Sequence, residues 1–554
     1  MSDLPVREGN ADIPPRDVRD WWRDAVVYQI YPRSFQDSDG DGIGDLPGIR
    51  SRLPYLAELG VDAIWLSPFY PSPLLDGGYD VIDPRDVDPR LGTVADLRGI
   101  VEDAHAFGLR VFVDIVPNHF SWEHPWFRAA LENEPGSPEW DRFHAVRGKG
   151  TNGELPPNNW HSAFGGPAWT PIPGHAGWWY LHLFDTSQPD LNWGNSEVHE
   201  DFDTTLRFWF DLGVDGFRID VAHSLVKADG LPDGPHVSMD QVMAGNERGP
   251  AWDQPGVHEI WREWRRVADS YEPPRVFVGE AWVATTEAQA AYTRPDELHT
   301  TFNFHFLRAH WDAAVIRDVI GTSLLTSAAV GAPPTWVLSN HDVWRPVTRF
   351  APWRDAHTVD LETGRRRAVA MSMLSLALPG SAYLYQGEEL GLPEVVDLPD
   401  EARQDPTFFR TQGRVKGRDG CRVPIPWSGE SPPYGFTTGT PWLPQPADWG
   451  PLTAAAQEAD DCSTLALYRR ALRVRRESPA LGDGELVWRE SGHDDVLAIE
   501  RPGDRSVLVL LNTGDGDRAV PVEGEVLLHT GDVSLDPDGA LVLAPDTCCW
   551  VALG

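Results

Sequence analysis

The chain has 554 residues, too many for one ordinary hydrophobic core, so we expect one large domain with additions or several domains. Its 47 Lys and Arg against 84 Asp and Glu give a formal net charge of -37. Such acidity repels phosphate backbones and anionic lipid surfaces, which argues against nucleic-acid and membrane partners and favours a neutral or cationic substrate.

Short apolar runs of strand-forming residues recur along the chain, and a stretch with helical periodicity follows each of them. Eight such runs predict a closed parallel (β/α)8 barrel, with a doubly wound open sheet as the main alternative. Polar residues cluster at the C-terminal ends of several runs, where the loops of such a barrel assemble an active site, and this favours the barrel. The predicted strands are Ala25–Tyr31, Asp62–Ser67, Arg110–Pro117, Gly216–Asp220, Arg275–Gly279, His299–Phe304, Thr335–Ser339 and Ala382–Tyr385.

Three segments depart from this alternation. A stretch rich in Pro, Gly, Asn and Trp follows the third run and predicts an irregular subdomain over the barrel mouth, and residues 387–442 form another Pro/Gly-rich excursion. From about residue 482, short β runs such as 507–511 and 541–544 alternate with Gly/Asp turns, which predicts a terminal antiparallel β domain. The predicted domains are residues 1–118 and 192–481 for the barrel, 119–191 for the insertion and 482–554 for the C-terminal domain.

The uncharged run from Ala368 to Gly387 is long enough to be mistaken for a membrane span. Pro379-Gly380 divides it into a predicted helix, Arg365–Leu378, and the strand that begins at Ala382. We therefore interpret the run as buried core.

The cysteines and the start of the chain bear on its location. Cys421, Cys462, Cys548 and Cys549 show neither metal-ligand spacing nor a framework of regular gaps. The start, MSDLPVREGNADIPPRDVRDWW, carries charges throughout and has no apolar signal core. We expect a reducing, cytoplasmic location. The sequence does not indicate an oligomeric state.

The fourth predicted strand contains the stretch DGFRIDVA, residues 215–222. Successive side chains of a strand alternate between its faces, so Arg218 and Asp220 point to the same side. A guanidinium within reach keeps a buried carboxylate ionised. The pair fits a permanently anionic catalytic group, but it fits a structural ion pair at a barrel end equally well.

Other strand ends carry companions for Asp220. The fifth run ends at Glu280 among Phe and Trp residues, and such an apolar setting raises a carboxyl pKa and suits a general acid. The third and seventh runs deliver His119, His341 and Asp342. Each of these residues alone is more often structural than catalytic, so the prediction of a site depends on their conjunction.

An ionised Asp beside a neutral Glu is what retaining glycoside hydrolysis requires. Asp220 would attack the anomeric carbon, while Glu280 would protonate the leaving oxygen and then activate water. Asp342, His119 and His341 would hold sugar hydroxyls. The mechanism predicts that the carboxyls of Asp220 and Glu280 lie about 5 to 5.5 Å apart. The 25 Trp residues, whose flat rings suit the apolar faces of sugars, are compatible with a carbohydrate substrate.

Taken in order, the motifs resemble the α-amylase superfamily, glycoside hydrolase family 13, and within it the α-glucosidase and oligo-1,6-glucosidase group. The resemblance covers the chain from Trp21 onward. It implies a (β/α)8 barrel with a B domain inserted after the third strand and a C-terminal β-sandwich. The matching motifs are DIVPNH (114–119), QPDLN (188–192), GFRID (216–220), GEAW (279–282), SNHD (339–342) and YQGEELG (385–391).

The resemblance also implies roles for individual residues. It makes Asp220 the nucleophile, Glu280 the acid/base and Asp342 the stabiliser of the transition state, in a retaining, exo-acting enzyme that removes terminal glucose from short α-glucosides. Substrate contacts are implied for Tyr79 and Asp80 in GGYD, for Arg422 in GRDGCRVPIPW, and for Phe164 as an aromatic wall, besides His119, Arg218, His341 and Val221. Without the resemblance, Tyr79-Asp80 would be read as an ordinary turn and Phe164 as part of a small satellite core.

A second motif, DSDGDGIGD, places alternate carboxylates around a glycine turn, as calcium loops do. An EF-hand would need Glu at the twelfth position, which is Gly48, so that reading fails. The resemblance implies a structural Ca²⁺ and no organic cofactor. The implied ligands are Asp37, Asp39, Asp41, the Ile43 carbonyl and Asp45. The alternative is a solvated acidic turn.

The scissile linkage stays open at this level. In the resembling group, Val directly after the nucleophile, here Val221, accompanies α-1,6 activity, whereas Ala or Thr accompanies α-1,4 activity. Val343-Trp344 stands where many oligo-1,6-glucosidases carry Gln-Pro, so the departures fall near the leaving sugar.

Two further functions compete with hydrolysis. One is a transglucosylase or isomerase on the same scaffold, of the trehalose synthase or sucrose isomerase type. The other is a non-catalytic, transporter-associated protein. Such chains lose catalytic carboxylates and carry a membrane anchor, and this one retains all three carboxylates.

Overall fold

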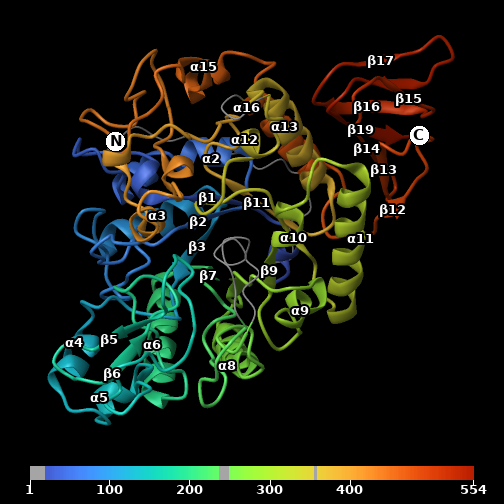
Figure 1. Ribbon diagram of the computed structural model, residues 1–554. Helices are drawn as coiled ribbons and strands as arrows, with labels where there is room; N and C mark the ends of the chain where they lie inside the picture. The colour runs from blue at the N-terminus through green and yellow to red at the C-terminus, as the bar shows by residue number, and fades with distance from the viewer. Residues whose placement is uncertain (1–18, 236–248, 355–358) are drawn as a thin grey trace.

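The computed structural model describes residues 19–235, 249–354 and 359–554, and a closed barrel of eight parallel strands lies at its centre (Figure 1). Around the barrel the strands keep their chain order, and β11 pairs with β1 to close the circle. This closure confirms the predicted (β/α)8 barrel and excludes the open sheet. The strands are β1 (Val26–Ile30), β2 (Ala63–Leu66), β3 (Arg110–Ile115), β7 (Gly216–Ile219), β8 (Val276–Gly279), β9 (Thr300–Asn303), β10 (Thr335–Val337) and β11 (Ser381–Tyr385).

The barrel strands are buried on both faces, which is why they read as nearly continuous apolar runs. Along β1, Val27 belongs to the core inside the barrel together with Trp65 and Phe112. Its neighbours Val26 and Tyr28 belong to the larger core between the barrel and its helices. Side chains of one strand therefore serve two cores by simple alternation.

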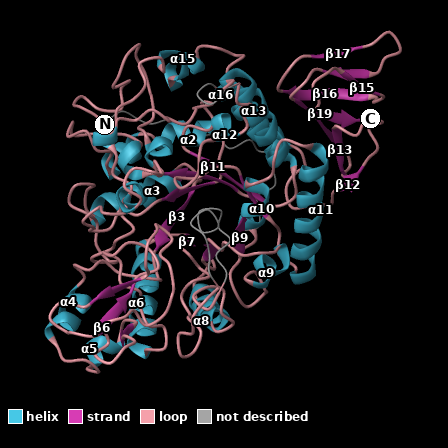
Figure 2. Cartoon of the chain, viewed as in Figure 1, coloured by secondary structure: helices cyan, strands magenta, loops and turns pink. Residues whose placement is uncertain are grey.

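Helices follow the strands and cover the outside of the barrel (Figure 2). In α6 the Asn195 side chain caps the first turn, and Gly213 (φ 113°) ends the helix in the left-handed conformation that glycine adopts without strain. The longer helices are α2 (Leu53–Leu59), α3 (Val94–Ala106), α6 (Ser196–Leu212), α8 (Val257–Asp269), α11 (Ala313–Val330), α13 (Leu361–Ala377) and α16 (Thr464–Glu477). Shorter ones are α1 (Leu46–Ser51), α9 (Thr286–Ala291), α10 (Phe304–Leu307), α12 (Pro346–Arg349), α14 (Pro406–Arg410) and α15 (Ala454–Glu458).

The uncharged run that mimics a membrane span forms the buried parts of α13 and β11, as predicted. Among the described helices, α11 alone is long and apolar enough to cross a bilayer by length and composition. It is nevertheless the barrel helix between β9 and β10, and it packs Ala313, Ile316 and Ile320 inward. Only 28% of its residues are buried, so the helix packs on the barrel along one side.

The segment inserted between β3 and α6 carries a small antiparallel sheet in the order β4-β6-β5 and lies at the end of the molecule away from the C-terminal sheets (Figure 1). A separate cluster that includes Trp160, Trp169 and Leu181 forms its core. Its elements are α4 (Pro125–Glu132), α5 (Pro138–Asp141), β4 (Ala145–Arg147), β5 (Trp169–Pro171) and β6 (Trp178–Leu181).

The C-terminal part consists of two antiparallel sheets with apolar residues packed between them, as the predicted β-sandwich requires. One sheet has the order β12-β13-β14-β19-β16 and the other β15-β18-β17. The strands are β12 (Val487–Trp488), β13 (Val496–Arg501), β14 (Val507–Asn512), β15 (Arg518–Val520), β16 (Gly524–His529), β17 (Val533–Leu535), β18 (Leu541–Leu543) and β19 (Thr547–Leu553). The residue boundaries of the four predicted domain segments stay a prediction. The predicted lack of an export signal falls mostly on residues 1–18, outside the described residues.

Candidate active site

The three carboxylates singled out in the sequence meet at one cavity. Asp220 comes directly after β7, Glu280 directly after β8, and Asp342 lies in the loop after β10. They converge because the C-terminal ends of parallel barrel strands form one rim. The cavity is lined by Asp76, Tyr79, His119, Phe164, Phe184, Asp220, Val221, Glu280, Asp342 and Arg418.

Arg218 is the centre of the hydrogen bonding at this rim. Its Nη1 lies 2.9 Å from Asp220 Oδ1 and 2.7 Å from Asp114 Oδ1, and its Nη2 donates to Glu280 Oε2. The guanidinium is fully buried, so these carboxylates supply its charge compensation. Arg218 and Asp220 share a face, as the strand pattern predicts, but Arg218 also contacts the second catalytic candidate, Glu280.

The surroundings of Asp220 and Glu280 differ from those that the sequence predicted. Burial raises the pKa of Asp220 well above its usual range despite Arg218, and it raises the pKa of Asp114 to about 7. Glu280 does not sit among purely apolar walls: Arg218, the Val221 amide and the Trp282 indole all donate to it. Strand alternation predicts which residues share a face, but it does not reveal how many carboxylates pair with one guanidinium group.

Asp342 has a different environment. Its Oδ1 accepts hydrogen bonds of 2.9 Å from both Arg418 and Arg422, and its Oδ2 lies 3.3 Å from His341 Nε2. Burial by itself would raise the pKa of Asp342, but His341 and the two guanidinium groups hold it well below its usual range. Asp342 therefore stays anionic at every pH at which the protein is expected to work.

The structure corrects the predicted glucose-gripping carboxylate. Asp80 is fully buried and does not line the cavity, and its oxygens accept hydrogen bonds from the Ser72 hydroxyl and the Leu75 amide. Asp76, four residues earlier in the same turn, lines the cavity instead and receives a 2.7 Å hydrogen bond from Arg418. Both carboxylates belong to one short turn, so the sequence alone could not choose between them.

The predicted arginine is corrected in the same way. Arg422 holds Asp342 and the His341 carbonyl, but it does not line the cavity. Arg418, from the same GRDGCR motif, lines it and joins Asp76 to Asp342. The signal for Arg418 was present in the motif, and only the packing of the loop after β11 decided which arginine reaches inward.

His119, His341 and Tyr79 form a neutral part of the site. His119 lines the cavity, and burial lowers its pKa to about 4, so it is a neutral imidazole near pH 7. The Tyr79 ring stacks on His341 at 5.2 Å, and its hydroxyl lies 3.1 Å from Asp114 Oδ2. His341 does not line the cavity but supports Asp342 from behind.

Aromatic and aliphatic groups complete the wall. Phe164 lines the cavity where the sequence placed it, and the Arg418 guanidinium lies 4.8 Å from the centre of its ring. Val221 lines the cavity beside Glu280. Phe184 was missed, because nothing in the inserted segment marks it. Trp282, whose indole Nε1 lies 2.7 Å from Glu280 Oε1, was visible only as part of GEAW.

The acidic loop after β1 brings part of the predicted calcium ligand set together. The carboxylate oxygens of Asp37, Asp39 and Asp45 lie within 4.8 Å of one another, which fits one cation. Asp41 is outside this group, and its Oδ1 accepts the Ile43 amide at 2.7 Å.

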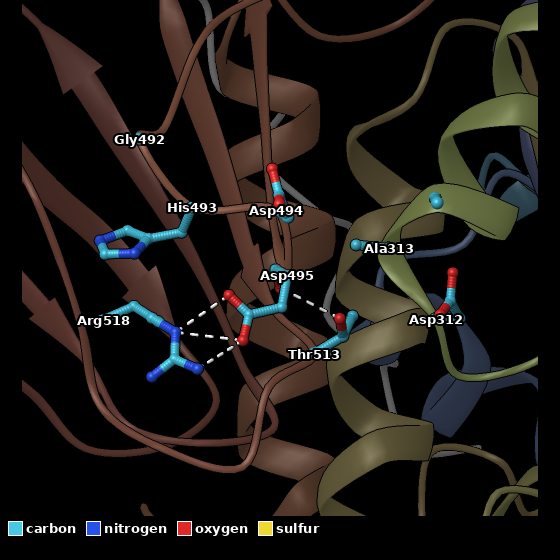
Figure 3. A pocket seen from close by; sticks show the side chains of 9 residues that line it. Asp312, Ala313, Gly492, His493, Asp494, Asp495, Thr513 and Arg518 are labelled. Carbon is cyan, nitrogen blue, oxygen red and sulfur yellow. Dashed lines mark hydrogen bonds and ion pairs between the residues drawn. The ribbon is translucent and has the colours of Figure 1, made fainter.

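A second cleft lies between α11 and the C-terminal sheets (Figure 3). Its walls include Asp312, Asp494 and Asp495, and Arg518 is paired with Asp495 at 2.6 Å. No Trp, Tyr or Phe is among the described residues that line it, and no second arginine is available to bind its acids. It therefore lacks the features of the site at the barrel rim.

Known proteins that are similar to this chain include glucosidases, in agreement with the three carboxylates at the rim. Residues 29–484 match the family model of the α-amylase catalytic domain. A probable alpha-glucosidase of Rhizobium meliloti is 40% identical, over 94% of this chain and 96% of its own length. An oligo-1,6-glucosidase of Parageobacillus thermoglucosidasius is 36% identical, over 93% and 94%. The crystal structure of an alpha-glucosyl transfer enzyme is similar with a TM-score of 0.85 and 37% identity, covering 96% of this chain and 99% of that one.

Proposed function

Since the chain belongs to the α-amylase family, we propose that it is a retaining, exo-acting α-glucosidase that releases terminal α-linked glucose from disaccharides and short oligosaccharides. The observation that carries this proposal is the meeting of Asp220, Glu280 and Asp342 at a cavity that the Asp76–Arg418 pair closes on one side. A closed cavity admits the end of a sugar chain and not its middle.

The reaction uses two displacements at the anomeric carbon. Asp220 attacks and forms a covalent glucosyl ester while the bond to the leaving oxygen breaks, and Glu280 gives that oxygen a proton. Glu280 then removes a proton from water, which displaces Asp220 and restores both carboxyls. The anionic Asp342 faces the same cavity and stabilises the positive charge that develops on the sugar in each step.

The raised pKa of Asp220 bears on the first displacement, because only the anion is a nucleophile. Arg218 contacts both carboxyls, so one hydrogen-bonded cluster contains the group that must lose a proton and the group that must carry one. We infer that proton redistribution within this cluster, on substrate binding, prepares Asp220 for attack. Asp114 also accepts a hydrogen bond from Arg218, so it is a third carboxyl of this cluster among which protons are distributed.

The experiment that tests this function follows the anomeric configuration of the first glucose released. Retention predicts that ¹H NMR detects α-glucose before mutarotation, and early release of β-glucose would refute the two-displacement mechanism. A panel of maltose, isomaltose, sucrose, trehalose and starch gives the linkage. Starch should be the poorest of these, because a cavity closed at one end reaches only chain termini.

The second candidate is transfer of the glucosyl group to another sugar instead of water. The similarity to an alpha-glucosyl transfer enzyme supports it. Both reactions share the covalent intermediate, and they differ only in which hydroxyl reaches it. Product analysis at high maltose concentration separates them, because transfer yields new disaccharides or trisaccharides at the expense of free glucose.

The proposal for the preferred glycosidic linkage depends on one side chain, that of Val221. Val221 lines the cavity next to Asp220 and Glu280, where the branched side chain narrows the space for the leaving sugar. Its presence supports α-1,6 activity beside or instead of α-1,4 activity. Because a difference of one methyl group is worth only about 1–3 kcal/mol, the preference is expected to be partial.

We also propose that the acidic loop binds a structural Ca²⁺ through Asp37, Asp39 and Asp45, with Asp41 and the Ile43 carbonyl as further ligands. The grouping of the first three carboxylates supports this. A bound cation would hold the loop after β1 in its folded conformation and would take no part in the chemistry at the rim.

We propose a cytoplasmic location because all four cysteines are free thiols, as is usual in a reducing compartment.

A further inference from the structure

Val221, directly after the proposed nucleophile, has a strained backbone. Its φ of 38° lies in the left-handed region, which β-branched residues rarely occupy, and it is the only β-branched residue among the described non-glycine residues with positive φ. Such a conformation persists only where the surroundings enforce it. In this conformation the Val221 amide donates a 3.1 Å hydrogen bond to Glu280 Oε2.

Ser224 holds the other side of the strained residue, at the Val221 carbonyl. The Val221 carbonyl accepts the Ser224 amide at 3.0 Å, and the Ser224 hydroxyl lies 2.8 Å from the same carbonyl. The hydroxyl is also 2.9 Å from Asn118 Oδ1, at the end of β3. The turn after β7 is thus fastened to a neighbouring strand end, while its amide faces Glu280.

A buried ion pair fastens Ser224 in turn. Lys227 Nζ lies 2.9 Å from Asp190 Oδ2 and 2.9 Å from Asn118 Oδ1, and it donates to the Ser224 carbonyl. The contacts with Asn118 and Ser224 are hydrogen bonds, and the contact with Asp190 is an ion pair. Both side chains of the pair are almost fully buried. Asp190 belongs to the inserted segment, so the pair links that segment to the turn beside the reacting carboxyls.

The donors around Glu280 distinguish its two oxygens. Oε2 receives hydrogen bonds from Arg218 and from the Val221 amide, whereas Oε1 receives one, from Trp282. An oxygen that accepts two N–H groups is the poorer place for a proton. The Val221 amide therefore leaves Oε1 as the oxygen that carries the proton for the leaving group.

We propose that Ser224 and the Lys227–Asp190 pair are positioning residues, which keep Val221 in its strained conformation so that its amide orients Glu280 for proton transfer. This inference rests on the proposed glucosidase function. None of the three side chains lines the cavity, so they act through Val221 and not on the substrate.

The test compares two leaving groups in Ser224→Ala. A nitrophenolate leaves with little help from an acid, whereas a sugar alkoxide needs full protonation. The quantity compared is kcat/KM, which reports only the first displacement and not the later attack of water that Glu280 also assists. With the disaccharide that the wild type cleaves best, kcat/KM should fall by about ten- to a hundredfold, the scale of a small misplacement. With 4-nitrophenyl α-glucoside kcat/KM should fall less than about threefold, since Asp220 is untouched and nitrophenolate needs little protonation. Ser224→Thr keeps the hydroxyl and should restore most of the disaccharide activity.

Ser375→Ala is the matched control. Ser375 is another buried serine whose hydroxyl donates to a backbone carbonyl, in α13, and its loss should leave both activities unchanged. If Ser224→Ala is too unstable to assay, the double variant Lys227→Met/Asp190→Asn removes the ion pair without leaving a buried charge, and it should show the same difference between substrates. Melting temperatures report folding in each case.

Different results would refute the positioning role and the proposed glucosidase function. Equal losses on both substrates, or none in folded Ser224→Ala, would overturn the positioning role. A wild-type protein that cleaves neither substrate would instead refute the proposed function.

Discussion

Arg418 donates a 2.7 Å hydrogen bond to Asp76, a residue 342 positions away in the chain. The same guanidinium reaches Asp342 at 2.9 Å, so the loop after β2 and the loop after β11 meet over the reacting carboxylates. This contact closes one side of the cavity, and both Asp76 and Asp342 line that cavity. It also explains why the cavity suits a terminal sugar unit.

Replacing Asp76 by Asn should weaken recognition of that terminal unit. A hydrogen bond to a charged group contributes about 1.5–3 kcal/mol, so kcat/KM should fall by roughly 10- to 150-fold. The matched control is Asp80→Asn, four residues away in the same turn, which should keep near-normal kinetics because Asp80 does not line the cavity. The reverse pattern in steady-state assays would restore Asp80 as the substrate contact.

Replacing Asp220 by Asn should abolish turnover, because an amide cannot form the glucosyl ester. The expected loss in kcat is about 10⁴-fold or more, the scale of removing a nucleophile. Circular dichroism should show an unchanged fold, since Asn has nearly the same shape as Asp and Arg218 keeps its contacts with Asp114 and Glu280. A variant that still hydrolyses its substrate at a near-normal rate would contradict the assignment.

Asp80 predicts a pH dependence of stability. Burial raises its pKa in the folded protein from 3.8 to about 6, so between these values the folded state binds more protons than the unfolded state. Its contribution is full below pH 4 and is lost as the pH rises through 6, and it amounts to roughly 3 kcal/mol. Urea unfolding of wild type and Asp80→Asn at pH 4 to 7 measures this: the stability of wild type relative to the variant should fall with pH. A constant difference would contradict the buried environment of Asp80.

Removing calcium should lower the melting temperature, because a ligand bound only by the folded state stabilises it. At a free concentration 100 times the dissociation constant the contribution is about 2.7 kcal/mol. Dialysis against a chelator, followed by calorimetry with and without added Ca²⁺, measures it, and Asp39→Asn should reduce the shift. An unchanged melting curve, with no metal found by elemental analysis, would remove the proposal.

The strand ends of the barrel could be read from the sequence because both strand faces are buried. A doubly buried strand is a continuous apolar run, and the polar residue that ends it is conspicuous, as at Asp220 and Glu280. Periodicity therefore located the reacting groups along the chain, and the motifs supplied their order around the rim. The number of runs and the polar residues at their ends favoured a closed barrel over an open sheet, and the pairing of β11 with β1 decided it.

The sequence by itself determined which segments reach the rim, because hydrophobic periodicity is a local property of the chain. Only the tertiary structure decided which side chain of each segment faces the cavity: Asp76 and not Asp80, Arg418 and not Arg422. It also decided that one guanidinium, Arg218, serves three carboxylates. These choices depend on contacts between segments far apart in the chain, such as Asp76 and Arg418. The burial and the charge of each group at the rim depend on its neighbours in space, and a local sequence pattern does not show which residues these are.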